Sequence, residues 1–369
     1  MKKILALAMA ALMSTSLLAC SNGNTGSTGG TNSKTDSVSG EKPYVAIVSK
    51  GFQHQFWQVV KKGAEQAAAD YGVEITFDGP PTESDIQVQV DMLKSAIAKK
   101  PAAVCLAALD TESVKEQLQS LKDAGIPVVG FDSGVPNAPE GSIYATASTD
   151  NAAAAAIAAQ KLFENERFKA ALEKATKDAP ITVGVLSQDA TSESIISRTS
   201  GFIDKLVELV GKDNVKVIGH VKYAKDAADA KVIINVNVPA TTATADQKTG
   251  AEALLAQNPV AIYGSNENAA GGILAASNDG KEFDQKDGKF KDIIAIGFDA
   301  GKTQRTAVQN GWFYGSVTQD PYQIGYKAVE LAAKALKGEK AESAIIDTGA
   351  KWYNSENLSD SMISDLVYE

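Results

Sequence analysis

The sequence is poor in the residues that build metal centres and disulfide frameworks. It contains two cysteines and two histidines among 369 residues. His54 and His220 are far apart, and Cys105 lies in the apolar run AAVCLAAL, which is typical of a small buried residue. No cluster has the spacing of zinc ligands, so neither a metal nor a cofactor is expected.

Other signatures are missing as well. The net charge is -9, with no clustered basic face, so nucleic acid is not an expected partner. There is no GxxxxGK[ST] phosphate loop and no serine nucleophile elbow. Several carboxylates facing one cleft leave glycoside hydrolysis as an alternative, which needs a carboxyl pair at a defined separation. Nothing else in the chain favours an enzyme.

Residues 1–42 differ in composition from the rest of the chain. Residues 1–19 combine the basic start MKK with a short apolar run, as in a secretory signal peptide. The run ends in LLAC at Cys20, which resembles a bacterial lipobox and implies a lipidated Cys20 on the extracytoplasmic side of the cell membrane. An ordinary signal with a chance cysteine is the alternative. Residues 20–42 are rich in Gly, Ser, Thr and Asn and predict a flexible tether.

From residue 43 onward, short apolar runs alternate with helical patterns, in two successive sets. This order predicts an α/β fold of two doubly wound, parallel-sheet, Rossmann-like lobes. Strands are expected at 44–49, 73–79, 102–109, 126–132, 142–148, 181–187, 215–221, 260–265, 293–299 and 313–320. Helices are expected at 55–71, 84–100, 111–124, 150–164, 193–211, 245–257, 267–278, 302–310 and 321–337. The irregular segment 222–244 leaves an extra strand or hairpin open.

In such sheets, ligands bind outside the carboxyl ends of the strands. Carboxylates and amides recur directly after the expected strands, and two aromatic residues, Phe56 and Trp57, follow the first one. Carboxylates and amides accept hydroxyl hydrogen bonds, and flat rings cover apolar C–H faces. Trp57 lies off the buried stripe of its helix, so we expect a ligand or the other lobe to cover it. The pattern indicates a polyhydroxylated ligand.

Six motifs carry a resemblance that spans residues 43–350. They are FWQVVKKGAEQAA, GIPVVGFDS, ASTDN, SNENAAGGILAA, AIGFDAG and TQDPYQIGYKAVE. In this order they resemble the type I periplasmic sugar-binding proteins of ABC transporters, the ribose-binding-protein group. The resemblance implies a monomer that closes on a sugar by a three-crossover hinge and delivers it to a membrane permease with its ATPase. The implied lobes are 43–149 plus 320–347, and 150–319 plus 348–369.

The resemblance also implies site residues. Phe56 and Trp57 match the paired stacking rings, and Asp132 matches a hydroxyl-binding aspartate. The contacts expected from the other lobe and the hinge are Asn266, Asp299 and Gln319. Further candidates are Lys50, His54, Asp110 and Arg198, of which Asp110 is also a natural helix cap.

Two departures put ribose itself in doubt. Ser133 and Ile196 stand where arginines are expected beside the ligand. A narrower resemblance, through IVSK and TFDGPPTESDIQVQV, is to proteins that bind autoinducer-2 or rhamnose, in which a lysine at the position of Lys50 reaches the ligand. A sugar sensor coupled to a signalling receptor is a further alternative. Effector lobes of gene repressors share the fold, but no helix-turn-helix pattern precedes residue 43.

Overall fold

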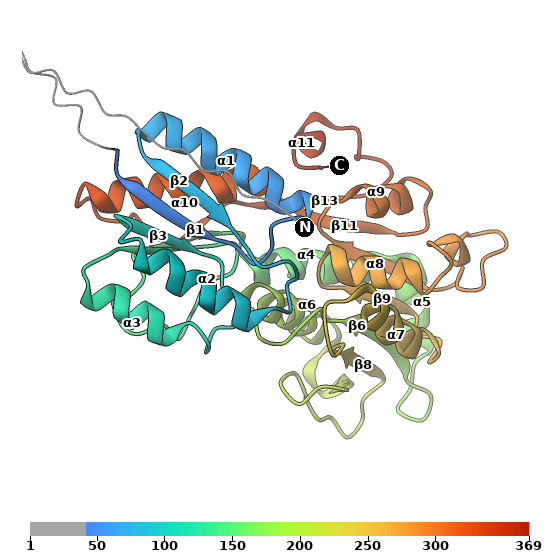
Figure 1. Cartoon of the computed structure of the whole chain (residues 1–369). Helices are drawn as coiled ribbons and strands as arrows, with labels where there is room; N and C mark the ends of the chain where they lie inside the picture. Colours follow the sequence, from blue (N-terminus) through green and yellow to red (C-terminus); the bar gives the residue numbers. More distant parts are fainter. Residues whose placement is uncertain (1–41, 369) are drawn as a thin grey trace, which may run out of the picture. The chain divides into compact units, whose positions relative to one another are not determined.

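The computed structural model describes residues 42–368 and contains two β-sheets, each covered by helices on both faces (Figure 1). The first sheet is parallel, in the order β12-β5-β4-β3-β1-β2. Its strands are β1 (Tyr44–Val48), β2 (Glu74–Asp78), β3 (Ala103–Leu106), β4 (Val128–Phe131), β5 (Ala145–Ser148) and β12 (Ile345–Asp347). Its central strands are short and wholly apolar, as expected of a parallel sheet buried on both faces.

The second sheet has the order β13-β11-β10-β9-β6-β8-β7. All its pairings are parallel except that of β13 with β11. Its strands are β6 (Ile181–Leu186), β7 (Val215–Ile218), β8 (Val232–Asn237), β9 (Ala261–Gly264), β10 (Ile294–Phe298), β11 (Gly315–Gln319) and β13 (Ala350–Tyr353). We call the first sheet with its helices lobe one and the second with its helices lobe two.

Lobe one carries α1 and α10 on one face of its sheet and α2 and α3 on the other. These helices are α1 (Gln55–Tyr71), α2 (Ile86–Ala98), α3 (Lys115–Asp123) and α10 (Pro321–Leu336). Helices α1 and α10 lie side by side although they are distant in sequence (Figure 1). A Cβ at Gly325 would collide with the backbone carbonyl of Val60, so only glycine permits this close approach.

Lobe two carries α4 and α6 on one face of its sheet and α7, α8 and α9 on the other. Its helices are α4 (Asn151–Glu164), α5 (Glu166–Lys174), α6 (Glu193–Val210), α7 (Thr244–Leu255), α8 (Glu267–Ala275), α9 (Lys302–Gln309) and α11 (Ser361–Ser364). Short 3₁₀ turns occupy Lys212–Asn214 and Lys281–Phe283. No helix within residues 42–368 is long and apolar enough to cross a membrane.

The chain passes between the two sheets three times. It crosses from β5 to α4, from β11 to α10, and from β12 to β13. Asp150 and Asp320 cap the helices that follow the first two crossings, each accepting a backbone N–H through its side chain. The first two crossings thus lead directly into capped helices.

The prediction of an α/β fold with two doubly wound lobes is confirmed. Segment 222–244, left open as an extra strand or hairpin, contains strand β8. Helix α3 begins at Lys115 and not at 111, because a capped turn precedes it, and α5 was not expected. The expected signal peptide and the Cys20 tether, apart from Lys42, fall outside the described residues.

Candidate functional site

A cavity of about 210 Å³ lies where the carboxyl ends of strands from both sheets meet. This volume is below the roughly 300–1,000 Å³ of pockets for drug-sized ligands. Nine of the ten predicted site residues line it: Lys50, His54, Phe56, Trp57, Asp132, Arg198, Asn266, Asp299 and Gln319. The rest of the lining is Gly51, Phe52, Gln53, Pro81, Thr82, Glu83, Gln188, Ile195, Thr242, Glu267 and Asn268.

Two aspartates, Asp132 and Asp299, end matching Gly-Phe-Asp sequences at β4 and β10 and line the cavity. Their φ angles are +54° and +76°, in the left-handed region that few residues other than glycine adopt. Aspartate tolerates this conformation better than most side chains. Strained backbone at two strand ends that share one cavity is characteristic of a functional position.

On the side of lobe one, Lys50 lies between two carboxylates. Its Nζ is 3.3 Å from Oδ2 of Asp132 and 3.9 Å from Oε2 of Glu83, and it donates a hydrogen bond to Ser194 of lobe two. Burial opposes the charge of Lys50, but Asp132 and Glu83 outweigh burial and raise its pKa. Burial raises the pKa of Asp132, whereas Lys50 lowers that of Glu83 in spite of burial. Lys50 is therefore a buried, charged part of the wall.

The carboxylate of Asp132 is incompletely satisfied. It is 3% exposed, and among the described residues its Oδ2 has no aligned hydrogen-bond donor, although Lys50 is nearby. A buried carboxylate oxygen that lacks a donor is costly unless a partner supplies one. Asp132 is thus well placed to accept a hydrogen bond from a hydroxyl group of a bound molecule.

Trp57 is covered differently from our expectation. It is 1% exposed, and its cover comes from its own lobe. Its ring meets Phe56 and Phe131 edge to face, with centroids 5.0 and 6.3 Å apart. Its indole N–H donates to Oε1 of Glu83 at 2.8 Å. Helical periodicity did not predict this cover because both Phe131 and Glu83 come from outside the helix.

On the side of lobe two, Asp299 is held by several donors. Its Oδ1 accepts from the Gln319 amide at 2.7 Å, and its Oδ2 accepts from the backbone N–H of Glu267 at 3.0 Å. Nη1 of Arg198 is 3.6 Å from Oδ2. The Arg198 guanidinium lies 4.0 Å from the centre of the Phe298 ring, in a cation–π contact. Asp299 is therefore fixed in place by the protein.

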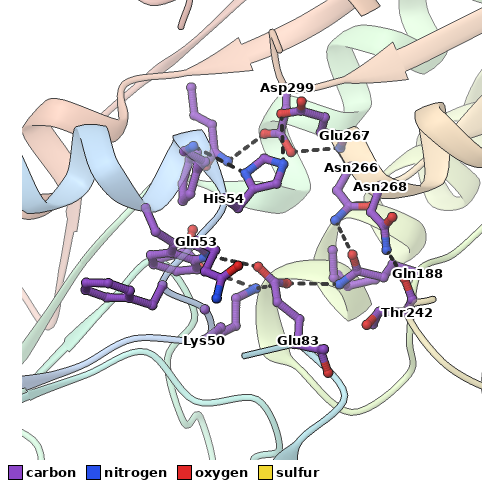
Figure 2. Close-up of a pocket in the computed structure, with 18 of the residues that line it drawn as sticks. Lys50, Gln53, His54, Glu83, Gln188, Thr242, Asn266, Glu267, Asn268 and Asp299 are labelled. Atoms are coloured by element: carbon purple, nitrogen blue, oxygen red, sulfur yellow. Dashed lines mark hydrogen bonds and ion pairs between the residues drawn. The ribbon is translucent and has the colours of Figure 1, made fainter. Parts of the chain in front are cut away.

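Asn266 caps a helix and also takes part in a chain of side-chain hydrogen bonds. Its Oδ1 accepts from the N–H of Ala269 and caps α8, while its Nδ2 donates to Oε1 of Gln188 at 2.6 Å. Gln188 in turn donates to Oε2 of Glu83 at 3.1 Å, across the lobe boundary (Figure 2). The amides of lobe two are thus connected to the carboxylate that holds Trp57.

His54 and Glu267 face each other from opposite lobes. Nδ1 of His54 accepts from the N–H of Phe56 and caps α1, and its Nε2 is 3.5 Å from Oε2 of Glu267 (Figure 2). The same oxygen accepts a hydrogen bond from the Tyr368 hydroxyl at 2.7 Å. Burial raises the pKa of Glu267, although His54 acts to lower it.

Asp110 is the one candidate that the structure does not bring into the cavity. Its Oδ1 accepts from the N–H groups of Glu112 and Ser113, so it caps the turn before α3 and not the helix itself. Ile195, rather than Ile196, lines the cavity at the start of α6. The side chain that faces the cavity is therefore one residue before the one expected from the sequence.

Of the seven polar residues that line the cavity but were not among the candidates, Glu83, Gln188 and Glu267 take part in the contacts described above. Glu83 and Glu267 lie within the motifs TFDGPPTESDIQVQV and SNENAAGGILAA but were not among the candidates, and neither was Gln188. The signal for Gln188 and Glu267 was their place just after β6 and β9, at the ligand-binding edge of the sheet. Glu83 precedes α2 in a long turn, where no periodicity identifies an inward-facing side chain.

The charged groups limit what the cavity can hold. Four carboxylates, Glu83, Asp132, Glu267 and Asp299, face two cations, Lys50 and Arg198. The net negative charge of these groups disfavours an anionic ligand. Their many acceptor oxygens suit a small neutral molecule with many hydroxyl groups. Within the described part of the chain, no group of His, Cys, Asp and Glu side chains is arranged to hold a metal ion.

Comparison with known proteins gives concordant matches. A family model described as a periplasmic binding protein domain matches residues 45–340. The ribose import binding protein of Bacillus subtilis is 25% identical over 79% of this chain and 80% of its own length. The D-allose-binding periplasmic protein of Escherichia coli is 24% identical, over 80% of this chain and 85% of its own.

Solved structures are similar over nearly their whole lengths. One, described as an ABC transporter, LacI family transcriptional regulator from Brachyspira murdochii, is 41% identical with a TM-score of 0.74. The alignment covers 89% of this chain and 99% of that one. An ABC transporter solute-binding protein from Agrobacterium vitis with bound D-fucose is 29% identical, with a TM-score of 0.70, over 88% and 100% of the two chains.

Proposed function

The chain belongs to the periplasmic binding protein family, and from this premise we propose that it captures a monosaccharide for an ABC importer. It is a binding protein of the sugar-transporter group and not an enzyme. Relatives named for ribose and allose, and a structure with D-fucose, support a single sugar as the ligand.

The observation that carries the proposal is the pair of aspartates at the two strand ends. Asp132 of lobe one offers an oxygen that lacks an aligned donor, and Asp299 of lobe two is held rigidly beside the same cavity. Phe56 and Trp57 contribute to the apolar part of the lining, together with Phe52, Pro81 and Ile195. A sugar has both hydroxyl groups and apolar C–H faces, so it matches this combination.

Closure of the lobes around the sugar would create the form that the permease recognises. Contacts between the lobes already surround the cavity. The Thr191 hydroxyl donates to the carbonyl of Leu109, and the N–H of Ser194 donates to the Ser133 hydroxyl. Hinge closure of two lobes around a ligand is a standard switching motion. In this proposal the partner ATPase supplies the energy for transport, and the binding protein acts as a monomer.

A second candidate is a deoxy sugar or autoinducer-2. It is favoured by Lys50, which lines the cavity and donates to Ser194, and by the D-fucose of the Agrobacterium vitis structure. These ligands have fewer or differently placed hydroxyl groups than ribose. The same cavity would hold them, so direct measurement of binding must decide.

A thermal-shift screen followed by calorimetry tests the proposal. Pentoses, hexoses, deoxy sugars, inositols, short oligosaccharides and autoinducer-2 are added singly, because a ligand that binds only the folded state raises the melting temperature. We expect one monosaccharide class to raise it, and the Asp132→Asn, Asp299→Asn double variant to lose the response. If autoinducer-2 alone raises it, the second candidate replaces the first. Absence of any shift would refute both, and cleavage of an oligosaccharide would favour an enzyme.

We further propose that Cys20 carries a lipid that tethers the protein to the outer face of the cell membrane. The proposal rests on the lipobox-like sequence LLAC and on the Gly- and Ser-rich residues that follow it. The Cys20→Ala variant should move from the membrane fraction to the soluble extracytoplasmic fraction. A variant that stays with the membrane would contradict lipidation at this position.

A further inference from the structure

Tyr368 joins the two lobes beside the cavity, although no sequence motif singled it out. It follows α11, and its side chain is 5% exposed. It does not line the cavity itself, but it contacts residues that do. Two sets of contacts define its position, one to lobe two through the backbone and one to lobe one through the ring.

The backbone around Tyr368 is fixed to lobe two. Nη2 of Arg305, on α9, donates to the carbonyl of Tyr368 at 3.0 Å. The hydroxyl of Thr318, on β11, donates to the carbonyl of Leu366 at 3.3 Å. The segment therefore has a defined path over lobe two, and the aromatic ring projects from an anchored backbone.

The ring of Tyr368 belongs to the apolar cluster of lobe one. It meets Phe56 edge to face at 6.0 Å between centroids, and His54 at 6.4 Å. Both are at the start of α1, and both line the cavity. A side chain carried by lobe two thus completes the apolar packing of lobe one, and opening the lobes would separate these rings.

The hydroxyl of Tyr368 orients a cavity carboxylate. It donates to Oε2 of Glu267 at 2.7 Å, the oxygen that also lies 3.5 Å from Nε2 of His54. On another side, a Cβ at Gly301 would collide with the same carboxylate, so the backbone there confines it closely. Glu267 is therefore held by His54, Tyr368 and the backbone at Gly301, and has little freedom to turn.

We propose that Tyr368 is a positioning residue for ligand binding, which directs the Glu267 carboxylate and stabilises the closed arrangement of the lobes. The inference rests on the proposed function, because the site is the same. A hydrogen bond to a charged acceptor is among the stronger kinds. The ring contacts of Tyr368 with Phe56 and His54 would form only when the lobes are together. The segment after β13 is then part of the binding mechanism.

A double-mutant cycle in the full-length protein tests this role. The Tyr368→Phe variant keeps the ring and removes only the hydroxyl, and we expect it to weaken binding of the sugar found in the screen about tenfold. In a Glu267→Gln background the same change should weaken binding less than twofold further, because the carboxylate it directs is gone. Tyr322→Phe, the same change at a partly exposed tyrosine on α10, should leave affinity unchanged.

Several results would overturn the proposal. Equal losses from Tyr368→Phe in both backgrounds would indicate a structural role that does not act through Glu267. Unchanged affinity in Tyr368→Phe would remove the hydroxyl from the mechanism. A second variant, Tyr368→Leu, should weaken binding more than Tyr368→Phe does. Equal effects of the two variants would mean that the ring contacts do not contribute to binding. Failure of the wild-type protein to bind any sugar refutes the proposed function instead, so the two failures are distinguishable.

Discussion

The same three residues, Gly-Phe-Asp, end a strand in each lobe, yet the two aspartates are stabilised in different ways. In lobe two, both oxygens of Asp299 accept hydrogen bonds, and Arg198 is nearby over the Phe298 ring. In lobe one, Asp132 depends on Lys50, and its Oδ2 lacks an aligned donor. The strained backbone is common to both, so the difference lies in the partners.

The difference indicates a division of roles. Lobe two offers a carboxylate that the protein has already oriented, which lowers the entropic cost of binding. Lobe one offers a carboxylate whose hydrogen bonding a ligand would complete, which makes binding there sensitive to the presence of a hydroxyl group. The comparison therefore predicts that substitutions in the two lobes separate effects on stability from effects on affinity.

The largest effect is expected from removal of Lys50. Lys50→Met leaves the buried carboxylates of Asp132 and Glu83 without their cation, and should lower the free energy of unfolding by ~3–5 kcal/mol. Arg198→Met should cost less, roughly 1–3 kcal/mol, because Asp299 keeps two donors. Urea unfolding at pH 7 without ligand measures both. Lys61→Met, at a partly exposed site on α1, is the control, and equal losses from the first two variants would contradict the comparison.

The next largest effect is expected from substitution of Asp132 or Asp299. Asn tolerates positive φ, so Asp→Asn removes charge with little backbone strain. Either variant should weaken sugar binding by ~2 kcal/mol in calorimetry. Asp299→Asn should lower the melting temperature more, because the Gln319 amide or the Glu267 N–H loses an acceptor. Asp132→Asn takes one carboxylate from Lys50, but it also relieves the cost of a buried charge, and Lys50 keeps Glu83. If Asp132→Asn melts as low as Asp299→Asn, the two strand ends are equivalent and the division of roles is wrong.

A smaller effect is expected from the aromatic residues beside the aspartates. Trp57→Phe removes the indole hydrogen bond to Glu83 and leaves a small space, at a cost of about 1–2 kcal/mol in both stability and sugar affinity. Phe298→Leu removes the ring beneath the Arg198 guanidinium, and should cost about 1–2 kcal/mol in stability. Its effect on affinity should be smaller, since Phe298 does not line the cavity. Calorimetry that shows no affinity change for Trp57→Phe would remove Trp57 from the ligand's surroundings.

Much of the fold could be predicted because its signals are local. Apolar runs such as AVCL and VVGF, separated by helical periodicity, identify parallel strands without any tertiary information. Strand β8 was harder, because its half-buried face carries Asn235 and Asn237 within an irregular segment. The start of α3 was misplaced because Asp110 caps a turn and not the helix itself.

The site was predictable only in part, because several of its contacts are long-range. Asp132 and Asp299 follow strands, so their positions could be inferred from the sheet alone. Glu83 reaches Trp57 from a turn before α2, and Tyr368 reaches Glu267 over a sequence separation of 101 residues. No periodicity or capping signal encodes such pairings. Residue patterns thus locate the binding edge, while the partners that orient each side chain emerge only in the folded chain.

The smallest expected effect concerns pH and contrasts two carboxylates of the cavity. Burial raises the pKa of Glu267 above its ordinary 4.5, so its ionisation costs stability at neutral pH, and this cost disappears as the pH falls toward 4.5. Lys50 lowers the pKa of Glu83 below 4.5, so its contribution is present above 4.5 and is lost as the pH falls through the lowered pKa.

Substitution by glutamine should therefore act in opposite directions. Without ligand at pH 7, Glu267→Gln should melt roughly 2 °C higher than the wild type, and Glu83→Gln lower, with both differences shrinking as the pH falls to 4. Melting curves between pH 4 and 8 measure this directly. Because His54 and Tyr368 both contact Oε2 of Glu267, a lower melting temperature for Glu267→Gln at pH 7 would mean that these contacts outweigh the cost of burial. The stabilising contribution of Glu267 in lobe two would then depend on its hydrogen-bond and ion-pair partners, as that of Glu83 does in lobe one.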